Sequence, residues 1–210
     1  MAGDAAMAMD RMYRHQRHVY DLTRKFYLLG RDRLIEELAP APGESVCEVG
    51  CGTARNLIAI ARRWPAARVC GIDASAEMLR TAAAAVARAG LTGRVALAQA
   101  DATSFDPQAL FGRRGPLDHL VFSYSLSMIP PWREAIDHGL TLLRPGGSLR
   151  VVDFGDQAGL PAGFRRLLFA WLGLFGVQVR PEMLAYLASL GAEMRPLYRG
   201  YAWSLVLRRP

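Results

Sequence analysis

Between residues 45 and 154, short apolar segments rich in branched side chains alternate with longer segments of helical periodicity. Consecutive parallel strands need a crossover connection, and a helix is the usual one. The alternation therefore predicts an α/β fold, a Rossmann-like doubly wound and mostly parallel sheet with helices on both faces. The predicted strands are Ser45–Val49, Arg68–Ile72, Arg94–Gln99, Leu117–Ser123 and Ser148–Phe154, and the predicted helices are Ala54–Trp64, Ser75–Ala89 and Pro131–Leu143.

The C-terminal part departs from this alternation. Helices are predicted at Pro161–Val177 and Pro181–Leu190, and the strands Glu193–Leu197 and Ala202–Arg208 are predicted to form a hairpin. Because a hairpin pairs its strands antiparallel, we expect a C-terminal antiparallel strand at the end of the sheet.

The composition narrows the possible classes of protein. No apolar run reaches the roughly 20 residues that a membrane-spanning helix needs, and no signal peptide is recognisable, so we expect a cytoplasmic protein. The three cysteines, Cys47, Cys51 and Cys70, are too scattered for a disulfide framework and lack the partners of a zinc site, so they are predicted to be buried apolar side chains, and no metal is expected. The formal net charge of +7 favours an anionic partner: nucleic acid, an acidic substrate or an anionic membrane face.

A glycine-rich turn follows the first predicted strand. Gly50 and Gly52 let the backbone turn sharply and let a ligand approach without a Cβ in the way. The turn lies at the carboxyl end of a strand, where open α/β sheets bind ligands. Nicotinamide and flavin enzymes share such a turn, so the glycines alone do not identify the ligand.

Three carboxylates at successive strand ends indicate which ligand the turn holds. Glu48, two residues before Gly50, would repel a dinucleotide pyrophosphate at the helix N-terminus. S-adenosylmethionine (SAM) has no phosphate, and its sulfonium and amino groups are cations that tolerate nearby acids. Asp73 can accept both ribose hydroxyls, with a helix N-cap as its alternative role, and Asp101 is placed to accept from the adenine amino group. Together the three acids favour SAM.

The motif series Glu48-Val49-Gly50-Cys51-Gly52, Asp73, Asp101 and Leu143-Arg144-Pro145-Gly146-Gly147 resembles that of the class I SAM-dependent methyltransferases, over roughly Ser45 to Phe154. Ala54 departs from the pattern, because the family often carries a third glycine there. The resemblance implies a methyltransferase with SAM as its cofactor. The residues expected to hold the cofactor are Tyr20, Glu48, Gly50, Cys51, Gly52, Asn56, Asp73, Ala74, Met78, Asp101, Ala102 and Phe122.

We expect the chain to form a single domain. Residues 1–8 are predicted to be a disordered tail, and residues 9–210 a methyltransferase domain. Within that domain, residues 9–38 are expected to form an N-terminal helical lid, 45–154 the SAM-binding core, and 160–190 a helical segment on the acceptor or membrane side.

The loop at residues 122–132 faces the methyl acceptor in this family. It lacks the Asn/Asp-Pro-Pro-aromatic run that resembles nucleobase amino methyltransferases. Nucleic acid is therefore not expected as a partner, despite the basic charge.

Tyrosines and arginines share one stripe of a predicted N-terminal helix, because Tyr13, Arg17, Tyr20, Arg24 and Tyr27 recur at spacings of four and three. Aromatic faces suit a sulfonium or a methylated ammonium group, and arginine suits a carboxylate, so the stripe can line the mouth of the cofactor pocket. The alternative is a helix that packs its tyrosines on the core while its arginines reach outward.

The predicted helix Pro161–Val177 is apolar and aromatic, with Arg165 and Arg166 near its start. An apolar helix with a basic edge is what a membrane-surface anchor needs. An ordinary helix covering the sheet edge is the alternative.

Three longer stretches, Met9–Lys25, Phe122–Ala135 and Val151–Asp156, are similar to the bacterial betaine-lipid methyltransferases. The resemblance implies repeated methylation of the amine of diacylglyceryl-homoserine to the trimethylated betaine lipid. It also implies a lipid substrate made by a separate aminocarboxypropyl transferase, an anionic membrane surface as partner, and a cytoplasmic location peripheral to the inner membrane face.

The expected reaction is an in-line attack of the substrate amine on the SAM methyl group, governed by proximity and orientation. The amine must be neutral, so a local acceptor or water must take its proton. The candidate catalytic residues are Tyr20, Tyr27, Arg24, Ser123 and Tyr124, with His18 as a further proton acceptor and Arg17 as an alternative to Arg24 for binding the carboxylate.

Three other functions remain open at this point. The first is another small-molecule methyltransferase, acting on a quinone, a phosphatidylethanolamine head group or a soluble amine, because the same cofactor site serves all of these. The second is a nicotinamide-dependent reductase, which Glu48 disfavours. The third is a SAM-binding protein without catalysis.

Overall fold

The computed structural model describes residues 28–112, 115–173 and 177–210, and every structural statement below concerns these residues. The predicted tail at residues 1–8 and most of the predicted lid at residues 9–38 lie outside them. Residues 174–176 of the predicted helix Pro161–Val177 lie outside them too, and its last residue, Val177, is described and is not helical.

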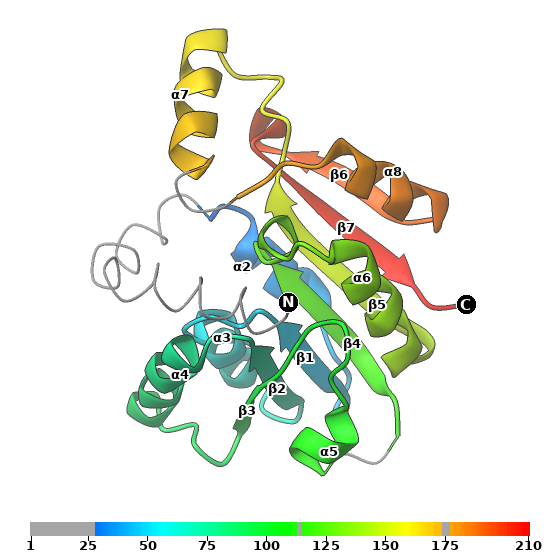
Figure 1. Cartoon of the computed structure of the whole chain (residues 1–210). Helices are drawn as coiled ribbons and strands as arrows, with labels where there is room; N and C mark the ends of the chain where they lie inside the picture. The colour runs from blue at the N-terminus through cyan, green and yellow to red at the C-terminus, as the bar shows by residue number, and fades with distance from the viewer. Residues whose placement is uncertain (1–27, 113–114, 174–176) are drawn as a thin grey trace.

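A seven-stranded sheet of order β3-β2-β1-β4-β5-β7-β6 forms the centre of the molecule (Figure 1). The first five strands pair parallel, whereas β7 pairs antiparallel with both β5 and β6. The predicted doubly wound sheet and its antiparallel C-terminal hairpin are therefore confirmed. The strands are β1 (Ser45–Val49), β2 (Arg68–Asp73), β3 (Val95–Gln99), β4 (Leu117–Ser123), β5 (Leu143–Phe154), β6 (Glu193–Leu197) and β7 (Ala202–Arg208).

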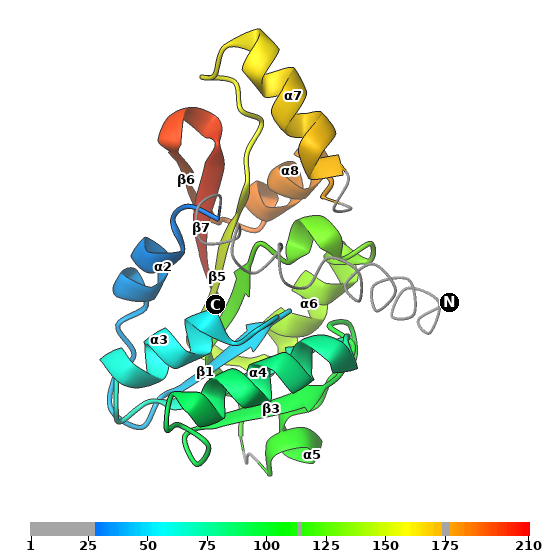
Figure 2. The ribbon, with the colours of Figure 1, turned by 90° about the vertical axis from the view of Figure 1, so that its left-hand side faces the viewer.

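Helices cover both faces of the sheet because successive strand residues point to opposite sides. Along β1, Val46 belongs to the hydrophobic core under α2, α3 and α4, and the next residue, Cys47, to the core under α6 and α8. Figure 2 shows α3 and α4 running side by side over their face. The helices are α2 (Arg31–Leu38), α3 (Arg55–Arg63), α4 (Ala76–Arg88), α5 (Pro107–Phe111), α6 (Trp132–Leu142), α7 (Ala162–Gly173) and α8 (Pro181–Ser189).

The sequence did not predict α5 or the two short 3-10 helices, Leu126–Met128 and Tyr198–Gly200. They are too short to show helical periodicity. Only a local signal marks α5: Asp106 caps it through a hydrogen bond from Gln108, and Pro107 occupies its first turn.

β5 begins at Leu143, five residues earlier than predicted. Leu143 pairs with Leu117 on β4, and the register shifts before His119 pairs with Ser148. The Pro145-Gly146-Gly147 segment, which the sequence indicated as a break between helix and strand, lies at this irregularity within β5.

Polar side chains form a cluster at the amino-terminal ends of β1 and β4. The carboxylate of Asp118 accepts hydrogen bonds from the backbone and hydroxyl of Ser45, at 2.9 and 2.7 Å, and from Nε of Arg144 at 2.6 Å. Arg144 also contacts Glu44 at 2.7 Å, and His119 contacts the other oxygen of Glu44 at 3.0 Å. These contacts join segments 100 residues apart in the chain.

Burial alone would raise the pKa of Asp118, but the hydrogen bonds from Ser45 and Arg144 outweigh it and hold that pKa below its ordinary value. A carboxyl group with a lowered pKa stabilises the fold at neutral pH, and this contribution is lost as the pH falls through its pKa in the folded state.

We predict that Asp118→Asn lowers the free energy of unfolding by about 1–3 kcal/mol at neutral pH, because the amide cannot accept all three hydrogen bonds. The difference from the wild type should narrow as the pH falls below the ordinary carboxyl value of about 4. Thermal unfolding across the acidic range measures this, with the exposed Glu36→Gln on α2 as control. A difference that stayed constant with pH would contradict the electrostatic explanation.

Candidate functional site

The turn after β1 is fastened to β2. The backbone N–H groups of Gly50 and Cys51 both donate to the carbonyl oxygen of Ile72, at 2.9 and 3.0 Å. Gly50 and Gly52 have φ angles of 73° and 53°, in the left-handed region that favours glycine. A Cβ on Gly50 would lie 2.6 Å from the Cβ of Ser125, so a larger residue would not fit between the turn and the loop after β4.

Asp73, at the end of β2, shapes the same turn. One of its carboxylate oxygens accepts the N–H of Gly52 at 2.8 Å, and the other accepts the N–H of Ser75 at 2.9 Å. The N-cap of α4 is Ser75, whose hydroxyl accepts from the N–H of Met78. Asp73 is therefore not the helix cap that was its alternative role, and its contact with a ribose stays a prediction.

Glu48 is buried between the sheet and α3. Its Oε1 accepts a hydrogen bond of 2.6 Å from the side-chain amide of Asn56, and its Oε2 has no hydrogen-bond partner among the described residues. Burial raises the pKa of Glu48 to about 8, although the bond from Asn56 opposes this. A buried carboxylate oxygen without a partner fits a cationic ligand, which would favour its ionised form.

An open cavity of about 610 Å³ extends from this turn. It is bordered by the glycine turn, by the loop after β4, and by the outward faces of α3 and α4. The predicted site residues that line it are Glu48, Gly50, Cys51, Gly52, Asn56, Ser123 and Tyr124.

The other predicted cofactor residues that the structure describes do not line this cavity. Asp101 is exposed, and its Oδ1 accepts from the backbone and hydroxyl of Thr103 in a local turn. Phe122 is fully buried in the sheet and Met78 in the core. Ala74 and Ala102 are partly exposed.

The predicted stripe of tyrosines and arginines lies in the part of the chain that the structure does not describe. Tyr20, Arg24 and Tyr27 lie outside the described residues, as do His18 and Arg17. Their roles stay predictions.

The loop after β4 is held in place by its own polar groups. Tyr124 donates its hydroxyl to the carbonyl of Leu29 at 2.5 Å, and Ser125 donates to the carbonyl of Val49 at 2.8 Å. Burial raises the pKa of Tyr124 far above its ordinary value, so this hydroxyl stays protonated and its hydrogen bond joins the loop to the segment before α2. Ser123 lines the cavity, and its hydroxyl has no partner among the described residues.

Four arginines in the cavity wall were missed by the sequence reasoning. They are Arg31, Arg55, Arg62 and Arg88. Arg55 forms an ion pair of 2.5 Å with Asp32. Arg62 lies further along α3, and Arg88 lies on α4. A signal was present on α3, because the spacing of its cavity residues is that of a single helix face. The residues of α3 that line the cavity are Arg55, Asn56, Ile58, Ala59 and Arg62.

Residues 46–147, just under half of the chain, match the family model described as methyltransferase domain. Two trans-aconitate 2-methyltransferases are similar in sequence. That of Azoarcus sp. (strain BH72) is 34% identical over 107 residues, which are 51% of this chain and 38% of that protein. That of Streptomyces avermitilis is 34% identical over 115 residues, 55% of this chain and 40% of that protein. The chain thus spans less than half the length of these relatives.

Solved structures share the fold. A SAM-dependent methyltransferase from Aquifex aeolicus aligns with a TM-score of 0.65 at 17% identity, over 90% of this chain and 93% of that one. The phosphoethanolamine N-methyltransferase 2 of Haemonchus contortus, in complex with S-adenosyl-L-methionine, aligns with a TM-score of 0.62 at 19% identity, over 80% of this chain and 38% of that one. At this identity the likeness shows the fold alone.

We predict that the affinity for SAM rises with pH between about 6 and 7.5 by about three- to ten-fold, because the cofactor's positive charge favours the ionised form of Glu48. Binding at neutral pH should release protons, which calorimetric titration in buffers of different ionisation enthalpy detects. Glu48→Gln should bind more weakly and lose most of the pH dependence.

The control for this experiment is Glu134→Gln, an exposed acid on α6. It should match the wild type in affinity and in proton release. If Glu48→Gln kept the full pH dependence, Glu48 would not be the group that titrates.

Proposed function

We propose that this chain, whose residues 46–147 match the methyltransferase-domain family model, is a class I SAM-dependent methyltransferase that transfers the methyl group of SAM to the amine of a carboxylate-bearing acceptor. The observation that carries the proposal is the charge arrangement of the cavity. A buried, unpartnered carboxylate oxygen of Glu48 lies at the glycine turn, and guanidinium groups line the outer wall. The first suits the cofactor, and the second suits a carboxylate on the acceptor.

The chain's own residues account for cofactor binding. When bound, SAM supplies an electrophilic methyl group on a sulfonium. Glu48 opposes the positive charge, Gly50 and Gly52 let the backbone come close, and Asp73 keeps the turn in shape through Gly52. The site thereby orients the cofactor before the acceptor arrives. Such orientation of the two reactants supplies most of the rate enhancement of a displacement reaction.

The arginines support an acceptor with a carboxylate. Arg62 and Arg88 are exposed on the cavity wall, and the planar guanidinium group binds carboxylates in a bidentate manner. The homoserine head group of diacylglyceryl-homoserine carries both a carboxylate and an amine, which agrees with the resemblance to betaine-lipid methyltransferases at Phe122–Ala135 and Val151–Asp156.

The acceptor amine has an ordinary pKa of about 8 and must lose a proton before it attacks. Ser123 lines the cavity, and its buried hydroxyl has no partner among the described residues, so it is free to accept a hydrogen bond from the amine, whose proton passes to water. In this proposal Ser123 positions the amine, and no side chain of the described cavity needs to be a strong base.

A second acceptor, trans-aconitate, is favoured by the names of the similar proteins and by the same arginine wall. It has three carboxylates and no amine. Carboxylate oxygens are ionised at neutral pH, so their methylation requires no proton removal.

We predict transfer of label from methyl-labelled SAM to diacylglyceryl-homoserine in mixed micelles, with a rate that rises from about pH 6 to about pH 8.5 as the amine is deprotonated. Trans-aconitate and phosphatidylethanolamine serve as the comparison acceptors, and mass spectrometry counts the methyl groups added. Transfer to trans-aconitate alone, with a rate at saturating SAM that is independent of pH, would favour the second acceptor. SAM binding without transfer to any acceptor or lipid extract would contradict an enzymatic function.

A lipid acceptor requires contact with a membrane, and we propose that α7 provides it. The side chains of Phe164 and Leu167 are 54% and 69% exposed, and Arg165 and Arg166 beside them are exposed as well. The chain has no acidic residue between Asp156 and Glu182. This combination of apolar and basic side chains suits an anionic lipid surface.

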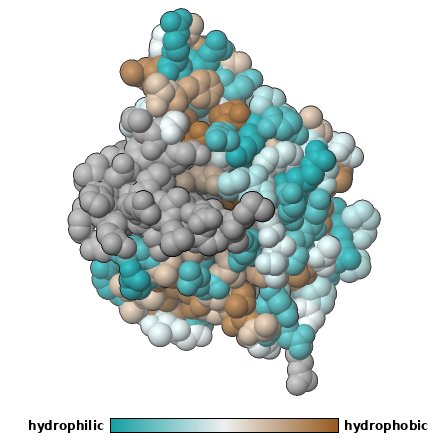
Figure 3. All heavy atoms as spheres, viewed as in Figure 1, coloured by the Kyte–Doolittle hydropathy of each residue, from teal (hydrophilic) through white to brown (hydrophobic). Residues whose placement is uncertain are grey.

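The place of α7 fits this role. The helix projects from the end of the molecule to which the strands β1 to β5 point (Figures 1 and 2), and hydrophobic and hydrophilic side chains lie next to each other there (Figure 3). Its inner face packs on the core through the buried Leu172 and the half-buried Leu168 and Trp171. No helix in the part of the chain that the structure describes is long and apolar enough to span a bilayer.

This arrangement would place the protein at the inner face of the cytoplasmic membrane. The acceptor would come from an aminocarboxypropyl transferase acting at the same surface.

We predict that the full chain sediments with vesicles containing phosphatidylglycerol and that added salt weakens this binding. Phe164→Glu combined with Leu167→Glu should reduce the bound fraction at least about ten-fold, because charge replaces the apolar surface that enters the interface. Leu110→Glu, on α5, is the matched control, because Leu110 is also exposed at 36%. Equal sedimentation of the double variant and the control would contradict a membrane role for α7.

A further inference from the structure

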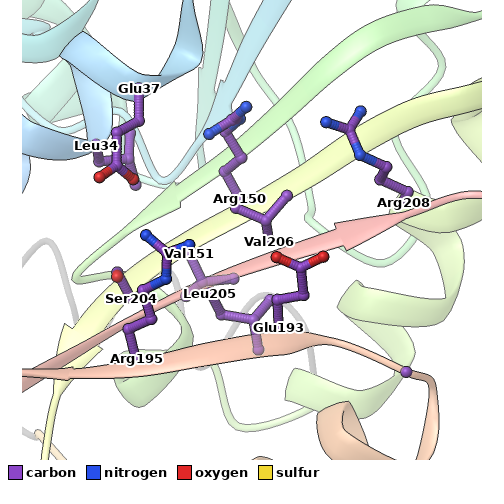
Figure 4. A pocket seen from close by; sticks show the side chains of 11 residues that line it. Leu34, Glu37, Arg150, Val151, Glu193, Arg195, Ser204, Leu205, Val206 and Arg208 are labelled. Carbon is purple, nitrogen blue, oxygen red and sulfur yellow. The ribbon is translucent and has the colours of Figure 1, made fainter.

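A second cavity, of about 430 Å³, lies on the C-terminal strands, and none of its lining residues borders the cofactor cavity. Strands β5, β6 and β7 form its floor, and α2 forms one side (Figure 4). We call this cavity the strand groove. Its lining residues are Leu34, Glu37, Arg150, Val151, Gly191, Glu193, Arg195, Ser204, Leu205, Val206 and Arg208.

The strand register brings two arginines together in the strand groove. Arg150 on β5 pairs with Val206 on β7, and Ser148 pairs with Arg208. Arg150 and Arg208 are therefore diagonal neighbours across an antiparallel pair, at a typical separation of about 7–8 Å, which long side chains can span. Both extend to the same side of the sheet (Figure 4).

β6 adds one further cation and one acid to the same face. Arg195 pairs with Ser204, and Glu193 pairs with Val206. Side chains paired across strands share a face of the sheet, so both lie on the same face as Arg150 and Arg208. Glu193 lies opposite Val206, whereas Arg195 lies opposite Ser204, at the other end of the strand groove from Arg208 (Figure 4). The strand groove thus holds three arginines against two acids, since Glu37 also borders it.

The positive charge of the strand groove is poorly compensated. Glu37 already pairs with Arg33 at 2.7 Å. Within the described part of the chain, no carboxylate oxygen lies within 4.0 Å of a guanidinium nitrogen of Arg150, Arg195 or Arg208. The guanidinium of Arg150 donates a hydrogen bond of 3.3 Å to the hydroxyl of Ser148. Of the two acids that line the strand groove, Glu193 alone forms no ion pair with another described residue.

Arg150 is half-buried, and burial together with the neighbouring Arg208 lowers its pKa, although the charge of Glu37 opposes this. Arginine stays protonated in proteins, so the lowered pKa reflects an unfavourable charge that the fold tolerates. The attraction of an anion between the two guanidinium groups would offset both the repulsion and the desolvation cost.

We propose that the strand groove is a second binding site, which holds a phosphate group between the guanidinium groups of Arg150 and Arg208. Arg195 and Ser204 lie further along the same face, outside the space between these two guanidinium groups. The phosphate group belongs either to a small soluble molecule or to a lipid head group. The site is separate from the cofactor cavity, so its occupation does not depend on the proposed methyl transfer.

The test is calorimetric titration of the full chain with inorganic phosphate, at an ionic strength kept constant with chloride. We expect saturable binding, weakened at least about ten-fold in Arg150→Ala and in Arg208→Ala. Arg68→Ala, an exposed arginine on β2 outside both cavities, is the matched control and should bind like the wild type.

Two further measurements keep the test decisive. Affinity for SAM should be unchanged in all three variants, which shows that they are folded and separates this proposal from the cofactor site. If Arg150→Ala does not fold, the exposed Arg208→Ala carries the test alone. Phosphate affinity equal in Arg208→Ala and the wild type, or no saturation at constant ionic strength, would overturn the proposal.

Vesicles distinguish the two sources of phosphate. If the site takes lipid head groups, Arg208→Ala reduces binding to phosphatidylglycerol vesicles and inorganic phosphate competes with them. If it takes a soluble ligand, vesicle binding is the same in Arg208→Ala and the wild type while phosphate binding is lost. Either result supports the site and identifies its ligand.

Discussion

The hydrogen bonds that fasten the turn after β1 to the end of β2 determine the geometry of the candidate site. Ile72 receives two backbone N–H groups of the turn, and the carboxylate of Asp73 receives a third, from Gly52. These bonds fix the end of β1 relative to β2, and with it the position of Glu48 just before the turn. Ser125 closes the other side by donating to the carbonyl of Val49. The buried carboxyl group of Glu48 is thereby held in position before any ligand binds, which reduces the entropic cost of binding.

The fold could be predicted from the sequence because its determinants are local and repeated. The alternation of strand and helix periods predicted the parallel sheet. The predicted strands Glu193–Leu197 and Ala202–Arg208 have the same bounds in the structure. The early start of β5 could not be predicted, because it arises from the pairing of Leu143 with Leu117 and not from the local Pro-Gly-Gly segment. Tertiary pairing overrides local turn signals when both sides gain hydrogen bonds.

The candidate site was predictable only in part. Parallel topology places the carboxyl ends of β1, β2 and β3 on one side of the sheet, so the acids at 48, 73 and 101, which lie at or just after these ends, could be assigned to one region. Which of them would face the cavity depends on backbone geometry that a sequence does not reveal. Glu48 lines the cavity, whereas Asp101 is occupied by a local turn with Thr103. The arginines of the cavity wall were missed because α2, α3 and α4 contribute to it jointly, and the face spacing on α3 alone is also that of an ordinary amphipathic helix.

Ala54 illustrates how a departure from a motif is accommodated. It occupies the left-handed region, with φ of 62°, where the family often carries glycine, and it is fully buried. A non-glycine residue there costs about 1–2 kcal/mol, which the surroundings must offset. The N–H of Ala54 donates to the carbonyl of Cys51, and its own carbonyl accepts the N–H of Ile58, so both backbone groups are paired. Because its Cβ packs in the core with Leu57, the methyl group that strains the backbone also contributes apolar burial. The third position of the motif therefore tolerates alanine, whereas Gly50 does not, since a Cβ there would collide with Ser125.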